Sequence, residues 1–329
     1  MIVSRTPFRV SLFGGGLDHP QWFAHHGGQV IGFAIDKYCW VSVRRLPPFF
    51  DYKHRIVYST TELVNDYADI NHPAAREILR QNGPDFGVEI HHDGDLPARS
   101  GLGSSSAFTV GLLNALHAFN GQMTVKNQLA QEAIHFERQV LKEKVGVQDQ
   151  IFAAYGGFNH IVMNMNGICE VAPVIMPPER LELLNASLMM FFTGFSRIAS
   201  HVEEKKLAQL DKNEAAMHEM ADISRQAMAD MTDMDKDINW LGHWLERSWA
   251  IKRSLSDGVS SPSIDEMYEA AKGAGALGGK LLGAGGGGFM LLFVPPEMQY
   301  AVRDRLRGKI FVPFTIGAPG SRIEIYEPD

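Results

Sequence analysis

The chain has 329 residues, of which 45% are apolar and 21% charged, so it is long enough for two globular domains or fused lobes. Its formal net charge of −7 excludes the broad basic surface that general nucleic-acid binding requires. No run approaches the roughly 18 apolar residues that cross a membrane, and Arg5 and Arg9 interrupt any signal-peptide core, so we expect no membrane partner and a cytoplasmic location.

The first half of the chain predicts strands where apolar and β-branched residues cluster, and helices where apolar residues recur every three or four positions. The expected strands are Ile2–Phe13, Tyr38–Leu46, Arg55–Ser59 and Phe86–His91. A helix is expected to follow the serine run at 104–106 and to reach Phe119, and a second one to span Asn127–Lys144. The cysteines, Cys39 and Cys169, fit reduced thiols better than a disulfide.

The second half predicts a buried strand at Ser187–Thr193, a Met-rich helix at Ser200–Met231 and a strand at Phe289–Val294. A further helix is expected from Ser263, with Glu266 completing a capping box. Because strands and helices do not alternate regularly, we expect an α+β fold in two lobes. Prolines cluster near 173–180, which places the expected domains at 1–175 and 176–329.

The segment 97–107 has the composition of a phosphate-binding loop. Its glycines let backbone N–H groups turn toward an anion, its serines add hydroxyl groups that could also ligate Mg²⁺, and the following helix directs its positive end at the same point. It is no Walker A sequence, and a surface loop with a helix-capping serine is the alternative. The residues expected to bind the nucleotide are Pro97, Arg99, Ser100, Gly101, Leu102, Gly103, Ser104, Ser105 and Ser106.

Two further glycine-rich segments give weaker evidence for a ligand-binding site when each is considered alone. The first strand carries Arg9 and runs into Gly14–Gly16, with Asp18 just beyond. The second segment, Gly283–Gly288, holds four consecutive glycines before an apolar strand. Ordering each glycine costs about 1 kcal/mol relative to alanine, which a close approach to a ligand or another backbone would justify. Simple turns are the alternative for both segments.

Taken together and in this order, the three segments resemble the three motifs of the GHMP kinase superfamily across nearly the whole chain. Pro97–Ala107 is similar to the family's Pro-x-x-x-Gly-Leu-Gly-Ser-Ser loop, Pro7–Asp18 to the first motif and Gly283–Gly288 to the third. The resemblance implies an N-terminal lobe like domain 2 of ribosomal protein S5 and a ferredoxin-like C-terminal lobe. It also implies an ATP-dependent kinase that uses Mg²⁺ and acts on a small molecule.

The same resemblance implies catalytic roles for three side chains. Gly146–Gln150 is similar to the Gly-x-x-Asp-Gln segment of sugar kinases, which makes Asp149 the candidate base. Glu137 matches the helical glutamate that ligates Mg²⁺ together with a loop serine, here Ser105. Arg9 matches an arginine that holds the aspartate ionised, lowers the pKa of the substrate hydroxyl or stabilises the transferred phosphoryl group. A loop-capping Asp149 and an exposed helical Glu137 are the alternatives.

The N-terminus is similar to one subgroup of the family, the heptose 7-phosphate kinases. These carry Arg-Thr-Pro-Phe-Arg followed by Phe-Gly-Gly-Gly and an aspartate, as in Arg5–Asp18, and Thr193–Arg197 fits the same group. This implies phosphorylation of D-glycero-D-manno-heptose 7-phosphate at the C1 hydroxyl, giving the 1,7-bisphosphate for capsule or other surface polysaccharide. The residues expected on the substrate side are Asp18, Gly14, Gly15, Gly16, Arg197, Gly285 and Gly286, with Arg197 the first candidate for the 7-phosphate.

Other activities stay open at this point. Galactokinases carry Gly-Glu-His-Thr-Asp in the first motif, and the Glu-His pair is absent from Gly14–Asp18, which argues against galactose itself. A fucokinase- or galactokinase-like enzyme, a decarboxylase of the same superfamily and a non-catalytic sensor of sugar and ATP are the alternatives. Intact Asp149, Glu137 and Ser105 argue against the sensor. A homo-oligomer is left open.

Overall fold

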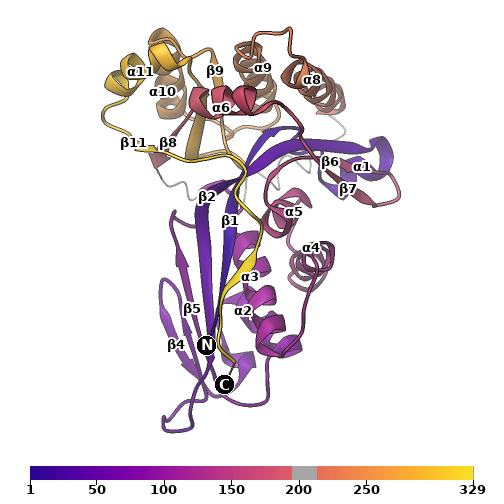
Figure 1. Ribbon diagram of the computed structural model, residues 1–329, viewed down its shortest axis with the longest axis vertical. Helices are drawn as coiled ribbons and strands as arrows, with labels where there is room; N and C mark the ends of the chain where they lie inside the picture. The colour runs from indigo at the N-terminus through magenta and orange to yellow at the C-terminus, as the bar shows by residue number, and fades with distance from the viewer. Residues whose placement is uncertain (195–212, 329) are drawn as a thin grey trace.

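The computed structural model describes residues 1–194 and 213–328. Figure 1 shows an elongated molecule of two lobes, each built on its own sheet, with both chain ends near each other in the part of the larger lobe away from the smaller one. The α+β, two-lobed architecture predicted from the sequence is confirmed. Arg197 lies outside the described residues, as does the first part of the helix expected from Ser200. In the described part of the chain, no helix combines the length and the apolar character that crossing a bilayer requires.

The sheet of the larger lobe has the strand order β12-β1-β2-β5-β3-β4, and β6 and β7 extend it from β2. Its two longest strands pair with each other in antiparallel fashion. Burial alternates along residues 2–5 and 38–43, and it is continuous along 6–13 and 30–35, where side chains on both faces of the sheet are buried. The strands are β1 Ile2–Phe13, β2 Gly28–Arg45, β3 His54–Val57, β4 Thr61–Val64, β5 Val88–Gly94, β6 Phe158–Met163, β7 Cys169–Pro173 and β12 Arg322–Tyr326.

Helices cover one face of this sheet (Figure 1). The central one, α3 at Ser104–Phe119, lies directly against β1 and β2 because Gly111 has no side chain. A Cβ there would lie 2.9 Å from Thr6 Oγ1, and the Ser4 hydroxyl donates to the Gly111 carbonyl at 2.7 Å. The helices that contact α3 are α2 Pro73–Asn82, α4 Lys126–His135 and α5 Gln148–Tyr155, and α1 Pro20–His26 lies away from this group, toward the smaller lobe (Figure 1). This close contact fixes the N-terminus of α3 relative to β1.

The smaller lobe has a sheet of order β11-β8-β10-β9. In β10 the side chains alternate between two cores: Phe289, Leu291 and Phe293 join the main core, whereas Met290 and Leu292 join a second cluster with α10. The elements are α6 Pro178–Ser187, β8 Leu188–Gly194, α8 Glu214–Thr232, α9 Trp240–Ser254, α10 Pro262–Gly273, β9 Gly278–Leu281, β10 Gly288–Phe293, α11 Gln299–Arg305 and β11 Ile310–Val312. The β8–β10 pairing brings the end of the third motif beside Gly194.

The chain leaves the smaller lobe after β11 and returns to the larger one. Strand β12 pairs antiparallel with β1, with Ile2 opposite Tyr326. Residues 322–326 therefore complete the sheet of the larger lobe, although they fall within the expected second domain, 176–329. This return explains why the two termini lie near each other in Figure 1.

One predicted helix start is wrong. The N-cap of α10 is Ser261, whose side chain accepts the Ile264 N–H at 3.4 Å, and Pro262 occupies the first helical turn. Ser263 lies inside the helix, so it and Glu266 form no capping box at this terminus. A serine followed by a proline at the first helical position is itself a start signal, and it outweighs the later Ser/Glu pair.

Candidate active site

The glycine- and serine-rich loop ends at the N-terminus of α3. Gly103 is the N-cap and has left-handed backbone angles, φ 73° and ψ 27°. The first helical bond runs from the Ala107 N–H to the Gly103 carbonyl at 2.9 Å. The N–H groups of 104–106 therefore have no carbonyl partner within the helix, and they lie at its positive end. This is the arrangement that binds phosphate in many proteins.

The other loop residues shape this terminus. Arg99 and Gly101 have positive φ angles of 58° and 84°, and the Ser104 hydroxyl accepts the Arg99 N–H at 3.1 Å. Ser100 and Leu102 are buried, Pro97 is half-buried and the Arg99 side chain is exposed. Of the loop residues expected to bind a nucleotide, the exposed Ser105 and half-buried Ser104 lie most openly at the helix end.

Arg9 holds Asp149 in a two-point ion pair. Arg9 Nε donates to Asp149 Oδ1 at 2.8 Å and Nη2 donates to Oδ2 at 2.7 Å, the fork geometry that fixes a carboxylate most firmly. The remaining terminal nitrogen, Nη1, donates to the Gly101 carbonyl at 2.7 Å. The Arg9 side chain is 7% exposed, whereas Asp149 is 27% exposed and so is open to a substrate.

Gly103 joins the phosphate-type loop to this ion pair. A Cβ at Gly103 would lie 3.2 Å from Arg9 Cγ and 3.4 Å from Asp149 Oδ2. The carboxylate is therefore in contact distance of the N-cap of α3, and an anion bound to the helix end would lie next to it. This placement suits transfer of a phosphoryl group to a hydroxyl group whose proton Asp149 accepts.

Glu137 is buried and only partly hydrogen-bonded. It lies on a π-helical turn, Phe136–Val140, that continues α4, and it is 1% exposed. Ser106 Oγ donates to Glu137 Oε2 at 2.9 Å, and Gln150 Nε2 donates to the same oxygen. The other oxygen, Oε1, has no hydrogen-bond partner among the described residues. Burial raises the pKa of Glu137 to about 8, against 4.5 for an ordinary glutamate.

These features fit a divalent cation better than a structural glutamate. A buried carboxylate oxygen without a partner is unfavourable, and Mg²⁺ prefers such hard oxygen ligands. The serine that contacts Glu137 is Ser106, because it lies on the buried side of α3, while the neighbouring Ser105 is exposed. The serine expected from the sequence to act with Glu137 is the neighbouring Ser105. The alternative of an exposed helical charge at Glu137 is wrong.

Asp18 connects the first motif to the segment of Asp149. It is 2% exposed, and its two carboxylate oxygens accept the Gly16 N–H at 3.0 Å and the Gln148 N–H at 3.2 Å. Gly146 packs on the same carboxylate, since a Cβ there would lie 1.9 Å from Oδ2. Asp18 therefore fixes the backbone around the site, and its contact with a substrate hydroxyl stays a prediction.

The glycines at 14–16 form a tight turn beside β2. Gly14 has φ 80°, and a Cβ there would lie 2.0 Å from the Gln29 carbonyl oxygen, so only glycine fits. Gly16 also has a positive φ of 105°. Gly15 lies near the side chain of Gln148, which is the first residue of α5 and directly precedes Asp149.

The third motif packs backbone to backbone against the loop before α3. A Cβ at Gly283 would lie 2.4 Å from Gly101 Cα, and one at Gly288 would lie 2.3 Å from the Ser100 carbonyl oxygen. The glycines thus let the smaller lobe support the phosphate-type loop directly. Gly285 and Gly286 face Val259 instead: Gly286 donates its N–H to the Val259 carbonyl at 3.0 Å. Their expected contact with substrate stays a prediction.

Two buried lysines that the sequence reasoning missed tie the motifs together. Lys280 Nζ donates to the Leu12 carbonyl at 2.9 Å, which joins β9 to the part of β1 that belongs to the first motif. Lys252 Nζ donates to the carbonyls of Leu281 and Gly283, at 2.8 and 2.5 Å. A lysine within the apolar run at 278–282 was the available signal for Lys280, because an unpaired buried ammonium is strongly unfavourable.

Three arginines of the larger lobe, which by their charge could bind a second phosphate, have protein partners. Arg55 lies 3.5 Å from Glu89, and Arg44 also pairs with Glu89. The Arg45 guanidinium lies over the Phe86 ring at 4.7 Å. These side chains lie on β2 and β3, and their pairing accounts for them without a ligand.

The N-terminus of α3, the Arg9–Asp149 pair beside it and the buried Glu137 suit a phosphotransferase with an alcohol group as acceptor. The family comparison gives the same class. The GHMP kinases N terminal domain matches residues 68–157, and the GHMP kinases C terminal domain matches residues 224–310. The chain belongs to the GHMP kinase family, as its motifs predicted.

Individual proteins are also similar to this chain over most of its length. The chain is 28% identical to the D-glycero-alpha-D-manno-heptose 7-phosphate kinase of Campylobacter jejuni, over 93% of each chain. It is 26% identical to the L-fucokinase/L-fucose-1-P guanylyltransferase of Bacteroides fragilis, over 99% of this chain and 37% of that protein. A crystal structure of a D-glycero-D-manno-heptose 1-phosphate kinase from Bacteroides thetaiotaomicron superposes with a TM-score of 0.80 at 22% identity, covering 99% of this chain and 100% of that one.

Proposed function

We propose that the protein transfers the γ-phosphoryl group of Mg²⁺-ATP to the C1 hydroxyl of D-glycero-D-manno-heptose 7-phosphate, giving the 1,7-bisphosphate. The observation that carries the proposal is the Arg9–Asp149 pair in contact distance of Gly103, the residue that begins α3. It puts a partly exposed carboxylate beside the point where a terminal phosphate would lie.

In this proposal the phosphates of ATP lie against the N–H groups of 104–106, where the helix dipole and the serine hydroxyls compensate their charge. Glu137 and a serine of the first turn of α3, either Ser105 or Ser106, would hold Mg²⁺. The bound ion would neutralise charge on the phosphate oxygens. Glu137 must lose a proton when it binds the ion, because its pKa of about 8 makes the carboxyl group neutral at neutral pH when no cation is bound.

Asp149 would accept the proton of the C1 hydroxyl as that oxygen attacks the γ-phosphorus. Both of its oxygens already accept a hydrogen bond from Arg9, so its orientation is set before the substrate arrives. Arg9 is anchored in turn by the Gly101 carbonyl, which keeps the guanidinium between the carboxylate and the loop. The positive charge is then in place to stabilise the transferred phosphoryl group.

The heptose phosphate is supported by the first motif, Arg5–Asp18, and by the relative from Campylobacter jejuni, which matches over 93% of each chain. The fucokinase relatives support a second candidate, phosphorylation of an unphosphorylated sugar. Both candidates use the same pair and loop, and they differ in whether the substrate carries a 7-phosphate. A pure sensor is disfavoured by the intact Arg9–Asp149 pair and Glu137.

Release of ADP in a coupled assay tests the proposal. The panel contains Mg²⁺-ATP with heptose 7-phosphate, sedoheptulose 7-phosphate, galactose, fucose, mannose or mevalonate. The proposal predicts turnover with heptose 7-phosphate at a kcat/KM well above that of every other compound. Turnover with fucose or galactose alone would replace the heptose assignment by the second candidate. No turnover with any compound would favour the sensor.

A further inference from the structure

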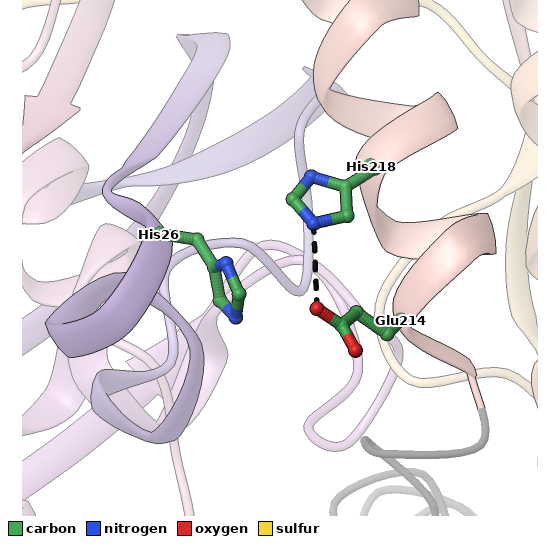
Figure 2. A group of neighbouring side chains, drawn as sticks. All are labelled: His26, Glu214 and His218. Atoms are coloured by element: carbon green, nitrogen blue, oxygen red, sulfur yellow. Dashed lines mark ion pairs between the residues drawn. The ribbon is translucent and has the colours of Figure 1, made fainter.

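Three side chains that commonly bind metals meet at a place that the proposed reaction does not use. His26 lies at the C-terminal end of α1, and Glu214 and His218 lie one turn apart on α8, directed toward it (Figure 2). Their ligand atoms all lie within 4.8 Å of one another, and His218 Nε2 lies 3.7 Å from Glu214 Oε1. We propose that these residues form a binding site for a divalent transition-metal ion, with Zn²⁺ the best match, that links α1 to α8.

The donor set favours this class of ion. Two imidazole nitrogens and one carboxylate oxygen, completed by water, are a common zinc coordination, whereas Mg²⁺ and Ca²⁺ prefer oxygen ligands alone. Ligand atoms around a tetrahedral zinc ion lie about 3.4 Å apart. All three side chains are exposed, so small rotations about their side-chain bonds can bring the atoms to that spacing and leave a position for water.

The two imidazole rings are already oriented by packing. Trp22, which is 3% exposed, stacks on His26 with ring centroids 4.2 Å apart and contacts His218 edge-on at 5.0 Å. The two histidine rings are themselves 5.0 Å apart and nearly perpendicular, at 89°. Glu214 and His218 share a helix face by their spacing of four residues. Because the buried indole restricts both rings, less side-chain freedom is lost when a metal binds.

A metal at this place would fix α8 against the segment that carries the first motif. The residue before His218, Met217, has its Cε 3.8 Å from the position that a Cβ of Gly16 would occupy. One turn further along α8, the Ala221 carbonyl accepts a hydrogen bond from Gln29 at 3.1 Å. The site would thus join an element of the smaller lobe to the loop at 14–18, and we expect it to stabilise the junction of the lobes.

The test is titration of tag-free, chelator-treated protein with ZnCl₂, followed by calorimetry, and with CoCl₂, followed by the visible absorption of tetrahedral Co²⁺. We expect one site in the wild type, affinity lowered tenfold or more in His26→Ala and in His218→Ala, and a smaller loss in Glu214→Gln. His25→Ala removes an exposed histidine of the same helix that lies outside the cluster, and it should bind zinc as the wild type does.

Thermal unfolding gives a second measurement that needs neither ATP nor sugar. Zinc at 100 times the wild-type Kd should raise the Tm of the wild type by about 4 °C, and that of His26→Ala and His218→Ala by about 2 °C or less. Equal zinc affinity in the wild type and both of these variants would overturn the proposal, as would absence of binding or loss of binding in His25→Ala. Since no kinase substrate is present, the outcome is independent of the heptose assignment.

Discussion

Replacement of Glu137 by glutamine tests whether this buried carboxyl group is held for a cation. Burial raises its pKa to about 8 in the folded protein, whereas it is near 4.5 when unfolded. Between these values the folded state binds a proton that the unfolded state has lost. The free energy of unfolding of the metal-free protein therefore falls as pH rises, by about 1.4 kcal/mol per pH unit from this group. Below pH 4.5 the contribution is fully present, and above pH 8 it is lost.

Glu137→Gln keeps the shape of the neutral carboxyl group and removes the titration. In EDTA, the Tm of the variant minus that of the wild type should increase by about 2 °C for each pH unit between 5 and 8. The exposed Glu182→Gln on α6 is the matched control and should follow the wild type. Thermal scans at pH 5, 6, 7 and 8 decide the point.

Parallel pH profiles for Glu137→Gln and the wild type would refute the reasoning, because they would mean that Glu137 titrates as it does when unfolded. A second measurement addresses the metal. The Mg²⁺ concentration that gives half-maximal kinase activity should rise in Glu137→Gln, while excess Mg²⁺ should stabilise the wild type more than the variant at pH 8.

Four other substitutions distinguish residues that act in catalysis from residues that only stabilise the fold. Asp149→Asn should lower kcat by about 10²-fold or more and leave the Kd for ATP within a few-fold of wild type; unchanged kcat would exclude Asp149 as the base. Gly103→Ala adds a methyl group 3.4 Å from Asp149 Oδ2 at a residue with φ 73°, so it should lower kcat/KM at least tenfold in steady-state assays; wild-type kinetics would mean that the loop and the carboxylate do not act together. Ser261→Ala should lower the free energy of unfolding by about 1 kcal/mol in urea titrations without changing kcat, and Ser263→Ala should change neither; the reverse order would restore Ser263 as the cap.

The elements that the sequence predicted well are those whose signal is local. The strand at Ile2–Phe13 has the predicted bounds. The helix expected after the serine run ends at Phe119 as predicted but begins earlier, at Ser104, so the three serines form its first turn. The proximity of Arg9, Asp149 and Glu137 to the loop followed from a family resemblance. Without that resemblance, nothing in the sequence links Arg9 to Asp149, which are 140 positions apart.

The features that the sequence did not predict depend on contacts between distant segments, or on which of two neighbouring side chains faces inward. Ser105 and Ser106 differ by one position on α3, and the packing of α3 against β1 decides that Ser106 points to Glu137. The π-helical turn at Phe136–Val140 contains the buried Glu137, and no pattern in the sequence predicts such a turn. The pairing of β12 with β1 joins residues more than 300 apart, and no local pattern predicts it.

The most direct test of the account is the identity of the product formed from ATP and D-glycero-D-manno-heptose 7-phosphate, determined by ³¹P and ¹H NMR. We expect a second sugar phosphate resonance that couples to the anomeric proton, appears at the rate of ADP release and forms about 10²-fold more slowly with Asp149→Asn. A new phosphate that couples to any other sugar proton, or ADP release without a second sugar phosphate, would contradict it.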